Sequence, residues 1–267
     1  MTTVLKIDHL SKGFGDFTAV NDISLAVTAG EIFGFLGPNG AGKTTTIKML
    51  AGLLLPGAGS ISICGHDLSR EPIAAKRLTG YIPDRPYLYE KLTGDEYLRF
   101  IASLYQGGDS EPALAAAGRY LELFDLGDWR HHLIEGYSHG MRQKLIMTSI
   151  FMLGQPLIVV DEPMVGLDPK SARIVKELFK SLAARGTAIF LSTHSMEIAE
   201  ELCDRIAIIQ HGRITTTGSI AELRAQAAAG KQNLEDIFLE LTGAYELQGI
   251  IAALRRDAAE RTCEAGR

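Results

Sequence analysis

Hydrophobic and polar positions divide the chain into three stretches with different periods. In the first, residues 4–10 and 59–65 alternate apolar and polar side chains, and residues 31–36 form a nearly continuous apolar run. Alternation is typical of a half-buried strand, whereas a continuous apolar run is typical of a strand buried on both faces. A glycine-rich turn follows this run, and the pattern then predicts a helix over residues 44–54.

The second stretch, residues 93–153, has helical patterns and no strand signal. Thr93 and Glu96 have the T-x-x-E spacing of a capping box, in which each side chain accepts a hydrogen bond from the other residue's backbone N–H. Further helices are predicted over residues 111–126 and 138–152. We interpret this stretch as a helical insertion in an α/β core.

Strands and helices alternate in the third stretch, which begins at residue 157. Its first strand, residues 157–160, is entirely apolar, as expected for a parallel sheet covered on both faces. This alternation indicates βαβ units and a mainly parallel sheet. Further strands are predicted over residues 187–192 and 205–210, and helices over residues 170–185, 196–202, 220–228, 233–241 and 245–255.

Composition and charge narrow the function classes. Of the 267 residues, 46% are hydrophobic and 22% charged, which is ordinary for a globular protein with a sizeable core. The net charge of −5 argues against a general nucleic-acid surface, although a local basic patch is compatible with it. Cys64, Cys203 and Cys263 lie far apart, so neither a disulfide framework nor a zinc site is indicated, and a reducing cytosol is the simplest setting. No signal-peptide pattern or membrane-spanning run is present, so we expect any membrane role to come through a partner.

A nucleotide site is predicted at the turn after residue 36. Gly37, Gly42, Lys43 and Thr44 fit the pattern G-x-x-x-x-G-K-[ST] between a strand and a helix, which disfavours a chance glycine turn. Glycines let backbone N–H groups approach phosphates without Cβ clashes, and the helix start directs its positive dipole end at the same anion. We expect Lys43 to reach the β- and γ-phosphates, and the Thr44 hydroxyl to ligate Mg²⁺. The expected cofactor loop comprises Gly37, Pro38, Asn39, Gly40, Ala41, Gly42, Lys43, Thr44 and Thr45.

Two carboxylates follow the apolar strand at residues 157–160. In a parallel sheet, the end of this strand lies beside the phosphate loop. We expect Asp161 to hold Mg²⁺, generally through water, and Glu162 to polarise the attacking water as a general base. The alternative is a pair of solvated acids at a strand end, which the phosphate loop upstream makes less favourable.

Three more motifs follow in the chain. Ser138 has the position of a helix N-cap, and Gly140 would let a phosphate approach the first helical turn, although alone this is an ordinary helix start. Residues 166–169, Gly-Leu-Asp-Pro, form a turn just after the carboxylate pair. His194 ends the next strand, where it can contact a γ-phosphate and the attacking water. A lone histidine is usually structural or exposed, so it is the set of motifs that favours function.

As a set, these motifs resemble the ATP-binding subunit of an ABC transporter, over residues 4–242. The signature loop and residues 233–243 are most similar to ABC-2-type exporter subunits. The matching segments are residues 37–44 (phosphate loop), 137–141 (signature loop), 157–162 (acidic strand), 166–168 (D-loop) and His194 (switch histidine).

The resemblance implies an α/β fold: a P-loop NTPase core with a mainly parallel sheet, an N-terminal antiparallel β subdomain and an inserted α-helical subdomain. It predicts an ATP-binding domain over residues 1–220, with the helical insertion at about residues 93–153, and a C-terminal helical extension over residues 221–267.

The resemblance also implies roles for single residues. Phe14 falls where the family stacks an aromatic ring on adenine, although it could equally be a core residue. Lys43, Mg²⁺ and His194 would hold the γ-phosphate from one side. Ser138, with the Gly140 region, would hold it from the other side.

Three positions depart from the family pattern. His139 stands where the family most often has glycine, and Met141 where it often has glutamine. Asp84 stands where a glutamine usually touches Mg²⁺ and links to the membrane subunit, but ABC-2-like members often carry an acid there. We therefore expect Asp84 to contact both the metal and the cofactor; the alternative is that it points to solvent and its charge is incidental. Asp168, in the D-loop, is also expected to contact the nucleotide.

The family works in pairs, so the resemblance implies a second ATP-binding subunit, either another copy of this chain or a close paralogue. Each ATP would lie between one subunit's phosphate loop and the other's signature helix. The resemblance further implies ATP and Mg²⁺ as cofactors, and ATP hydrolysis coupled to transport, with export as the direction. Transmembrane permease subunits would hold the chain at the cytoplasmic face of the cell membrane.

Two rival classes also contain phosphate loops. A soluble ABC ATPase acting on DNA or ribosomes would carry a long coiled-coil or zinc insertion, or two ATP-binding halves. This acidic chain has neither, so no nucleic-acid partner is expected. A P-loop kinase or GTPase would leave the signature helix and His194 unexplained. The sequence does not give the cargo, because the membrane subunits select it.

Overall fold

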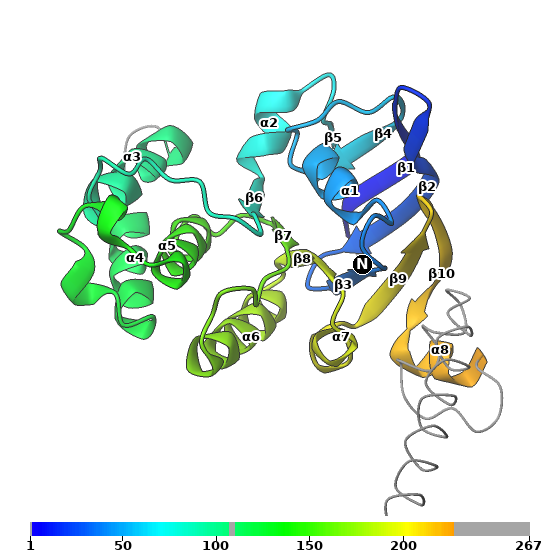
Figure 1. Ribbon diagram of the computed structural model, residues 1–267. Helices are drawn as coiled ribbons and strands as arrows, with labels where there is room; N and C mark the ends of the chain where they lie inside the picture. The colour runs from blue at the N-terminus through cyan, green and yellow to red at the C-terminus, as the bar shows by residue number, and fades with distance from the viewer. Residues whose placement is uncertain (1, 107–109, 227–267) are drawn as a thin grey trace, which may run out of the picture.

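The computed structural model describes residues 2–106 and 110–226. In this part of the chain a six-stranded sheet, in the order β10-β9-β3-β8-β7-β6, forms the centre (Figure 1). Neighbouring strands are parallel, except for the antiparallel pair of β9 and β10. The strands are β3 (Ile32–Leu36), β6 (Thr79–Ile82), β7 (Leu157–Asp161), β8 (Ala188–Thr193), β9 (Arg205–Gln210) and β10 (Arg213–Ser219).

An antiparallel sheet in the order β2-β1-β4-β5 is built from the N-terminal part of the chain. Leu5 and Ile7 of β1 are fully buried and share a hydrophobic core with Phe33 and Phe35 of β3. This shared core joins the two sheets, and the predicted fold class is confirmed. The strands are β1 (Thr3–Phe14), β2 (Phe17–Thr28), β4 (Ala58–Ile63) and β5 (His66–Asp67).

Helices cover the central sheet and form a separate group at one side (Figure 1). α1 contacts β7 and β8, and α6 and α7 contact β3 and β8, while α3, α4 and α5 pack together. This last group is the predicted helical insertion; the division into domains stays a prediction. The helices are α1 (Lys43–Leu50), α2 (Pro72–Arg77), α3 (Gly94–Gln106), α4 (Glu111–Leu123), α5 (His139–Phe151), α6 (Pro169–Ala184), α7 (Met196–Leu202) and α8 (Ile220–Gln226), with 3₁₀ turns at Gly127–Trp129 and Ile134–Gly136.

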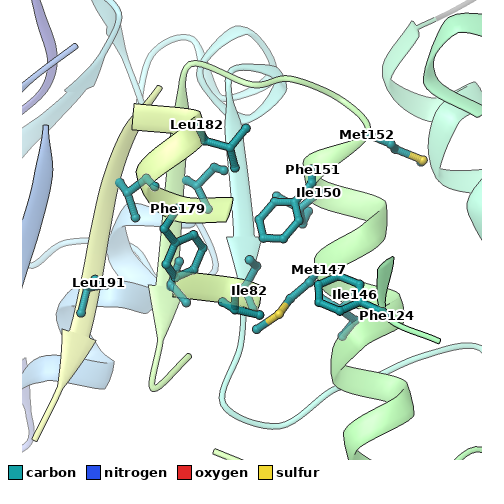
Figure 2. Close-up of a cluster of buried hydrophobic side chains, with 14 of the residues drawn as sticks. Ile82, Phe124, Ile146, Met147, Ile150, Phe151, Met152, Phe179, Leu182 and Leu191 are labelled. Atoms are coloured by element: carbon teal, nitrogen blue, oxygen red, sulfur yellow. The ribbon is translucent and has the colours of Figure 1, made fainter. Parts of the chain in front are cut away.

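Aromatic and aliphatic side chains join the helical group to the sheet (Figure 2). Phe151 of α5 meets Phe179 of α6 edge to face, with the ring centroids 6.0 Å apart. Ile82 of β6 and Leu191 of β8 belong to the same buried cluster. The position of α5, and with it the signature loop, is therefore fixed by a packed core rather than by a flexible connection.

Two predicted helices are shorter in the structure. α1 ends at Leu50, not at residue 54, because Gly52 has a φ of +66° and the N–H of Leu53 bonds back to the carbonyl of Lys48 at 2.9 Å. α4 ends at Leu123, not at residue 126, through the same kind of cap: Asp125 has a φ of +56°. Both ends follow the left-handed C-cap geometry, which glycine favours and aspartate tolerates.

Three short elements were not predicted: β5, α2 and β10. β10 is an edge strand whose sequence, RITTTGS, has only one large aliphatic residue, so its hydrophobic signal is weak.

The capping box at α3 is confirmed, since Thr93 N–H donates to Glu96 Oε2 at 2.8 Å and Glu96 N–H to Thr93 Oγ1 at 3.2 Å. The predicted helices over residues 233–241 and 245–255, and the end of the one over residues 220–228, lie outside the described residues.

Among the described residues, no helix combines the length and apolar character that a membrane span requires.

Candidate nucleotide-binding site

Three loops meet at the carboxyl ends of β3, β7 and β8. Because these strands are parallel neighbours, Leu36 pairs with Thr193, and Asp161 pairs with Ser192. The phosphate loop follows β3, Glu162 follows β7 and His194 follows β8. The fold thus brings together residues that are up to 157 positions apart in the sequence, at the edge where parallel sheets bind ligands.

The glycines of the phosphate loop are required by close backbone contacts. A Cβ on Gly37 would lie 2.4 Å from the carbonyl oxygen of Ile209, and a Cβ on Gly42 would lie 2.4 Å from that of Ala19. Gly42 also has a φ of +108°, which side chains strongly disfavour. The loop is therefore pressed against β9 and β2, and these contacts restrict its shape.

An open cavity of about 350 Å³ lies at this edge, and most of the predicted site contributes to its wall. Two residues of the wall, Phe17 and Ala19, were not predicted. Gly37, Pro38 and Ala41 belong to the loop behind it. The cavity is lined by Phe17, Ala19, Asn39, Gly40, Gly42, Lys43, Thr44, Thr45, Asp84, Asp161 and Glu162.

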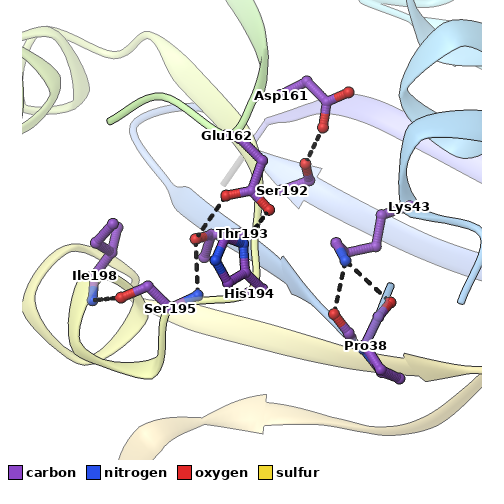
Figure 3. Close-up of polar contacts among 10 residues, drawn as sticks. Pro38, Lys43, Asp161, Glu162, Ser192, Thr193, His194, Ser195 and Ile198 are labelled. Carbon is purple, nitrogen blue, oxygen red and sulfur yellow. Dashed lines mark hydrogen bonds and ion pairs between the residues drawn. The ribbon is translucent and has the colours of Figure 1, made fainter. Parts of the chain in front are cut away.

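Lys43 bends back toward its own loop (Figure 3). Its Nζ donates to the carbonyl oxygens of Gly37 at 2.6 Å and Pro38 at 3.1 Å. Burial lowers the pKa of Lys43, and the nearby Glu162 and Asp161 oppose this effect. Among the described residues, the hydrogen bonds of this ammonium group go to neutral carbonyls, so its charge retains a strong attraction for an anion.

Asp161 presents a buried oxygen to the cavity. Its Oδ1 accepts a hydrogen bond from the Ser192 hydroxyl, whereas Oδ2 is buried and has no hydrogen-bond partner among the described residues. Burial raises the pKa of Asp161, and the Ser192 hydrogen bond opposes that rise. An unpartnered buried carboxylate oxygen, in the same cavity as the Thr44 hydroxyl and Asp84, suits a hard cation such as Mg²⁺.

No cluster of three or more His, Cys, Asp or Glu side chains with metal-site geometry occurs in the part of the chain that the structure describes.

Glu162, in the cavity wall, pairs with His194, which is not itself part of that wall (Figure 3). His194 Nδ1 lies 2.8 Å from Glu162 Oε1, and the Thr193 hydroxyl lies 3.4 Å from Oε2. Glu162 has a φ of +50°, a left-handed conformation that is unfavourable for a non-glycine residue. Its N–H donates to the carbonyl oxygen of Ser192 at 3.1 Å, which holds this conformation in place. Local strain of this kind is concentrated at functional sites.

Ser138, Gly140 and Asp168 lie outside the wall of this cavity. Ser138 is the N-cap of α5, as predicted, and its hydroxyl accepts from the Met141 N–H at 3.3 Å. Asp168 is the N-cap of α6 and accepts from the Ser171 N–H at 2.9 Å. The structure therefore does not bring these three residues to the phosphate loop of their own chain.

Phe17, rather than Phe14, belongs to the cavity wall. The two residues pair across the β1–β2 hairpin, and both rings are at least half exposed. The ring of Phe14 is covered by Lys12, whose Nζ lies 5.4 Å from its centroid. The only sequence signal for Phe17 was its place directly after the Gly15-Asp16 turn; the adenine-stacking role of Phe14 stays a prediction.

Phe17→Ala should weaken ATP binding, because an aromatic ring against a base contributes about 1–3 kcal/mol. Binding of inorganic triphosphate should change little, since that ligand has no base. Titrations of both ligands, with Phe14→Ala alongside, test this assignment. If Phe14→Ala lost ATP binding selectively and Phe17→Ala did not, Phe14 rather than Phe17 would be the residue that contacts the base.

Comparisons with known proteins show which family the chain belongs to. The family model described as ABC transporter matches residues 20–165. The chain belongs to the ABC transporter ATP-binding family. A relative supports the same assignment. The daunorubicin/doxorubicin resistance ATP-binding protein DrrA of Streptomyces peucetius is 38% identical to this chain, over 84% of this chain and 68% of its own length.

Other relatives and solved structures extend this likeness. The fluoroquinolones export ATP-binding protein of Mycobacterium tuberculosis is 40% identical over 81% of this chain and 70% of its own length. The structure of an ATP-binding subunit of an ABC transporter has a TM-score of 0.85 and 35% identity, over 90% of this chain and 99% of that one. A dimeric cassette bound to ADP and Pi, at 22% identity and a TM-score of 0.74 over 81% of this chain and 98% of that one, shares the fold. The predicted family is therefore confirmed: this chain is an ABC-type ATP-binding subunit of an ATP-hydrolysing family.

Proposed function

We propose that this ABC subunit binds Mg-ATP in the 350 Å³ cavity and hydrolyses it to power a membrane exporter. The observation that carries the proposal is the meeting of Lys43, Asp161 and the Glu162–His194 pair at one edge of the sheet. These groups supply a cation for phosphates, a buried oxygen for Mg²⁺, and a carboxylate with an orienting partner for water. Export is supported by the name of a relative, and the cargo would be set by the membrane subunits.

Each of these residues would have a separate role in ATP hydrolysis. The Lys43 ammonium would leave its loop carbonyls for the β- and γ-phosphates. Mg²⁺, held by Thr44, Asp161 and Asp84, would neutralise phosphate charge. Glu162 would accept a proton from the attacking water.

The geometry of the Glu162–His194 pair suits this division of roles. His194 engages Oε1 of Glu162 at 2.8 Å, and the contact of Thr193 with Oε2 is longer, at 3.4 Å. Oε2 is therefore the oxygen more readily free to take a proton from water. His194 would orient the carboxylate and contact the γ-phosphate from the adjacent strand end.

Ser138, Gly140 and Asp168 would complete the site of a second ATP-binding subunit, which is another copy of this chain or a close paralogue. They lie outside the cavity of their own chain, at the starts of α5 and α6, where Ser138 and Asp168 are exposed and Gly140 is half-buried. An isologous pair would place each set against the other subunit's ATP. The wider cofactor site then comprises Phe14, Gly37, Pro38, Asn39, Gly40, Ala41, Gly42, Lys43, Thr44, Thr45, Asp84, Ser138, Gly140 and Asp168.

A groove of about 550 Å³ between the sheet and the helical group is the proposed docking site for transmembrane subunits. Asp84 and Thr44 each line both this groove and the nucleotide cavity, so the two are adjacent. The loop that carries Asp84 is joined to α5, the helix that begins at the signature loop, because the buried Gln143 of α5 donates a hydrogen bond to the carbonyl oxygen of Pro83 at 3.0 Å. This contact would provide a physical route between the nucleotide and a membrane partner, which we place at the cytoplasmic face of the membrane.

Tyr87→Asp should break membrane attachment without abolishing ATP binding. Tyr87 lines the groove and is 86% exposed, so the change removes contact surface and places a charge there without disturbing a core. The measurement is sedimentation with membranes after co-expression with the cognate membrane protein. Ile73→Asp, at another exposed apolar position that does not line the groove, is the control. Equal sedimentation of all three proteins would argue against docking in this groove.

Asp84→Asn should change the Mg²⁺ dependence of hydrolysis when the membrane partner is present and leave the isolated subunit nearly unaffected. Asparagine keeps the shape of aspartate and removes its charge. We expect Asp84 to reach Mg²⁺ through a water once the partner closes its loop. Mg²⁺ titrations of the two proteins that overlay in the presence of the partner would contradict this role.

A further inference from the structure

The start of α5 touches the D-loop turn of the same subunit. A Cβ on Gly140 would lie 2.8 Å from the carbonyl oxygen of Gly166, so the two backbones are almost in contact. A Cβ on Gly166 would lie 2.3 Å from His139 Nδ1, so the imidazole ring covers the open side of Gly166. Gly140 is therefore required by packing within the chain, in addition to any contact with phosphate.

A second contact lies one helical turn further along α5. The ammonium group of Lys144, whose side chain is only 14% exposed, lies 3.2 Å from Asp168 Oδ2. Asp168 also accepts hydrogen bonds from the hydroxyl and N–H of Ser171, and these, followed by Lys144, hold its pKa below the usual range. The signature helix and the D-loop are thus joined at two points, His139 on Gly166 and Lys144 on Asp168.

We propose that His139 is a positioning residue that makes the signature loop and the D-loop act as one unit on the ATP of the second subunit. The inference rests on the proposed function, in which Ser138 and Asp168 both face that ATP. His139 does not touch the reacting atoms; it acts through Gly166. A glycine at position 139 would leave the face of Gly166 uncovered, and the turn could then move independently of α5.

His139→Gly should raise the ATP concentration needed for half-maximal hydrolysis, by roughly threefold or more, and make its ATP dependence less cooperative. ATP binding to the dilute monomer should be unchanged, because His139 lies outside the wall of the cavity. His139→Gln, which keeps a side chain over Gly166, should restore much of the wild-type ATP dependence. A purely structural role would instead lower the melting temperature and leave the ATP dependence of the remaining folded protein unchanged.

A double-mutant cycle of Gly166→Ala and His139→Gly tests the inference most sharply, because it compares the effect of Gly166→Ala with and without the imidazole. The alanine Cβ is strained by the φ of +80° in either background, but it collides with the imidazole only when His139 is present. Gly166→Ala should therefore reduce ATP-driven hydrolysis by a larger factor in the wild type than in His139→Gly. Equal factors in the two backgrounds would overturn the inference. A wild-type protein that neither hydrolyses ATP nor pairs with ATP would overturn the proposed function instead, so the two failures are distinguishable.

Discussion

Glu162→Gln should lower the rate of ATP hydrolysis by roughly 100-fold or more while Mg-ATP still binds. The glutamine has nearly the same shape, so its amide can keep a contact with His194, but it cannot accept the proton of the attacking water. ATP would then persist between two subunits. Gel filtration with Mg-ATP should show this variant shifting from the 28.9 kDa monomer toward a dimer.

Glu197→Gln is the matched control, because Glu197 is an exposed carboxylate three residues after His194 and lies outside the cavity wall. We expect it to hydrolyse ATP at the wild-type rate. If Glu162→Gln also turned over ATP normally, Glu162 would not be the general base. The unusual φ of Glu162 would then need a purely structural explanation.

Lys43→Ala should weaken ATP binding by roughly 10-fold to 100-fold, since hydrogen bonds to charged groups contribute about 1.5–3 kcal/mol. The change removes the buried cation from a cavity whose remaining charged residues, Asp84, Asp161 and Glu162, are all acidic. The triphosphate would then face carboxylates without a compensating charge. Direct titration with ATP, in the presence and absence of Mg²⁺, measures the loss.

Lys180→Ala, which removes a half-exposed lysine on α6, controls for a general loss of positive charge. It should bind ATP as the wild type does. The melting temperature of Lys43→Ala checks that the loop survives without the hydrogen bonds from Lys43 to Gly37 and Pro38. Normal ATP affinity in Lys43→Ala would mean that the nucleotide does not sit on this loop.

Elements with a strong apolar signal were predictable from the sequence. The strand that became β7, Leu157–Asp161, is buried at every position, and α7 has the bounds that the pattern predicted. Helix ends were less predictable, because they depend on backbone geometry at single residues. Asp125 takes a left-handed conformation that ends α4, and aspartate carries no unique signal for that role.

The motifs predicted which residues belong to the site, but they did not predict which side chains contact one another. Pairing of β7 with β8 places Asp161 beside Ser192, and no local pattern announces the hydrogen bond between their side chains. The sequence indicated Phe14, whereas only the three-dimensional cavity showed Phe17. The contact of His139 with Gly166 joins two motifs that the sequence presents as separate, because α5 and the D-loop meet only in the folded chain.

The central claim is that each ATP site is shared between two subunits, and mixing two inactive variants tests it most directly. Lys43→Ala removes the phosphate-loop cation, and Ser138→Arg replaces the exposed signature hydroxyl with a bulky side chain. A mixed pair of these two variants contains one site with both defects and one fully intact site. Each variant is assayed alone and in an equal mixture, with the membrane partner present.

Random pairing of equal amounts makes half of the pairs mixed, so the mixture should recover up to about a quarter of the wild-type hydrolysis rate. Each variant alone should remain near the background rate. A mixture that hydrolyses ATP no faster than the average of its two separate components would contradict a site shared between two copies of this chain.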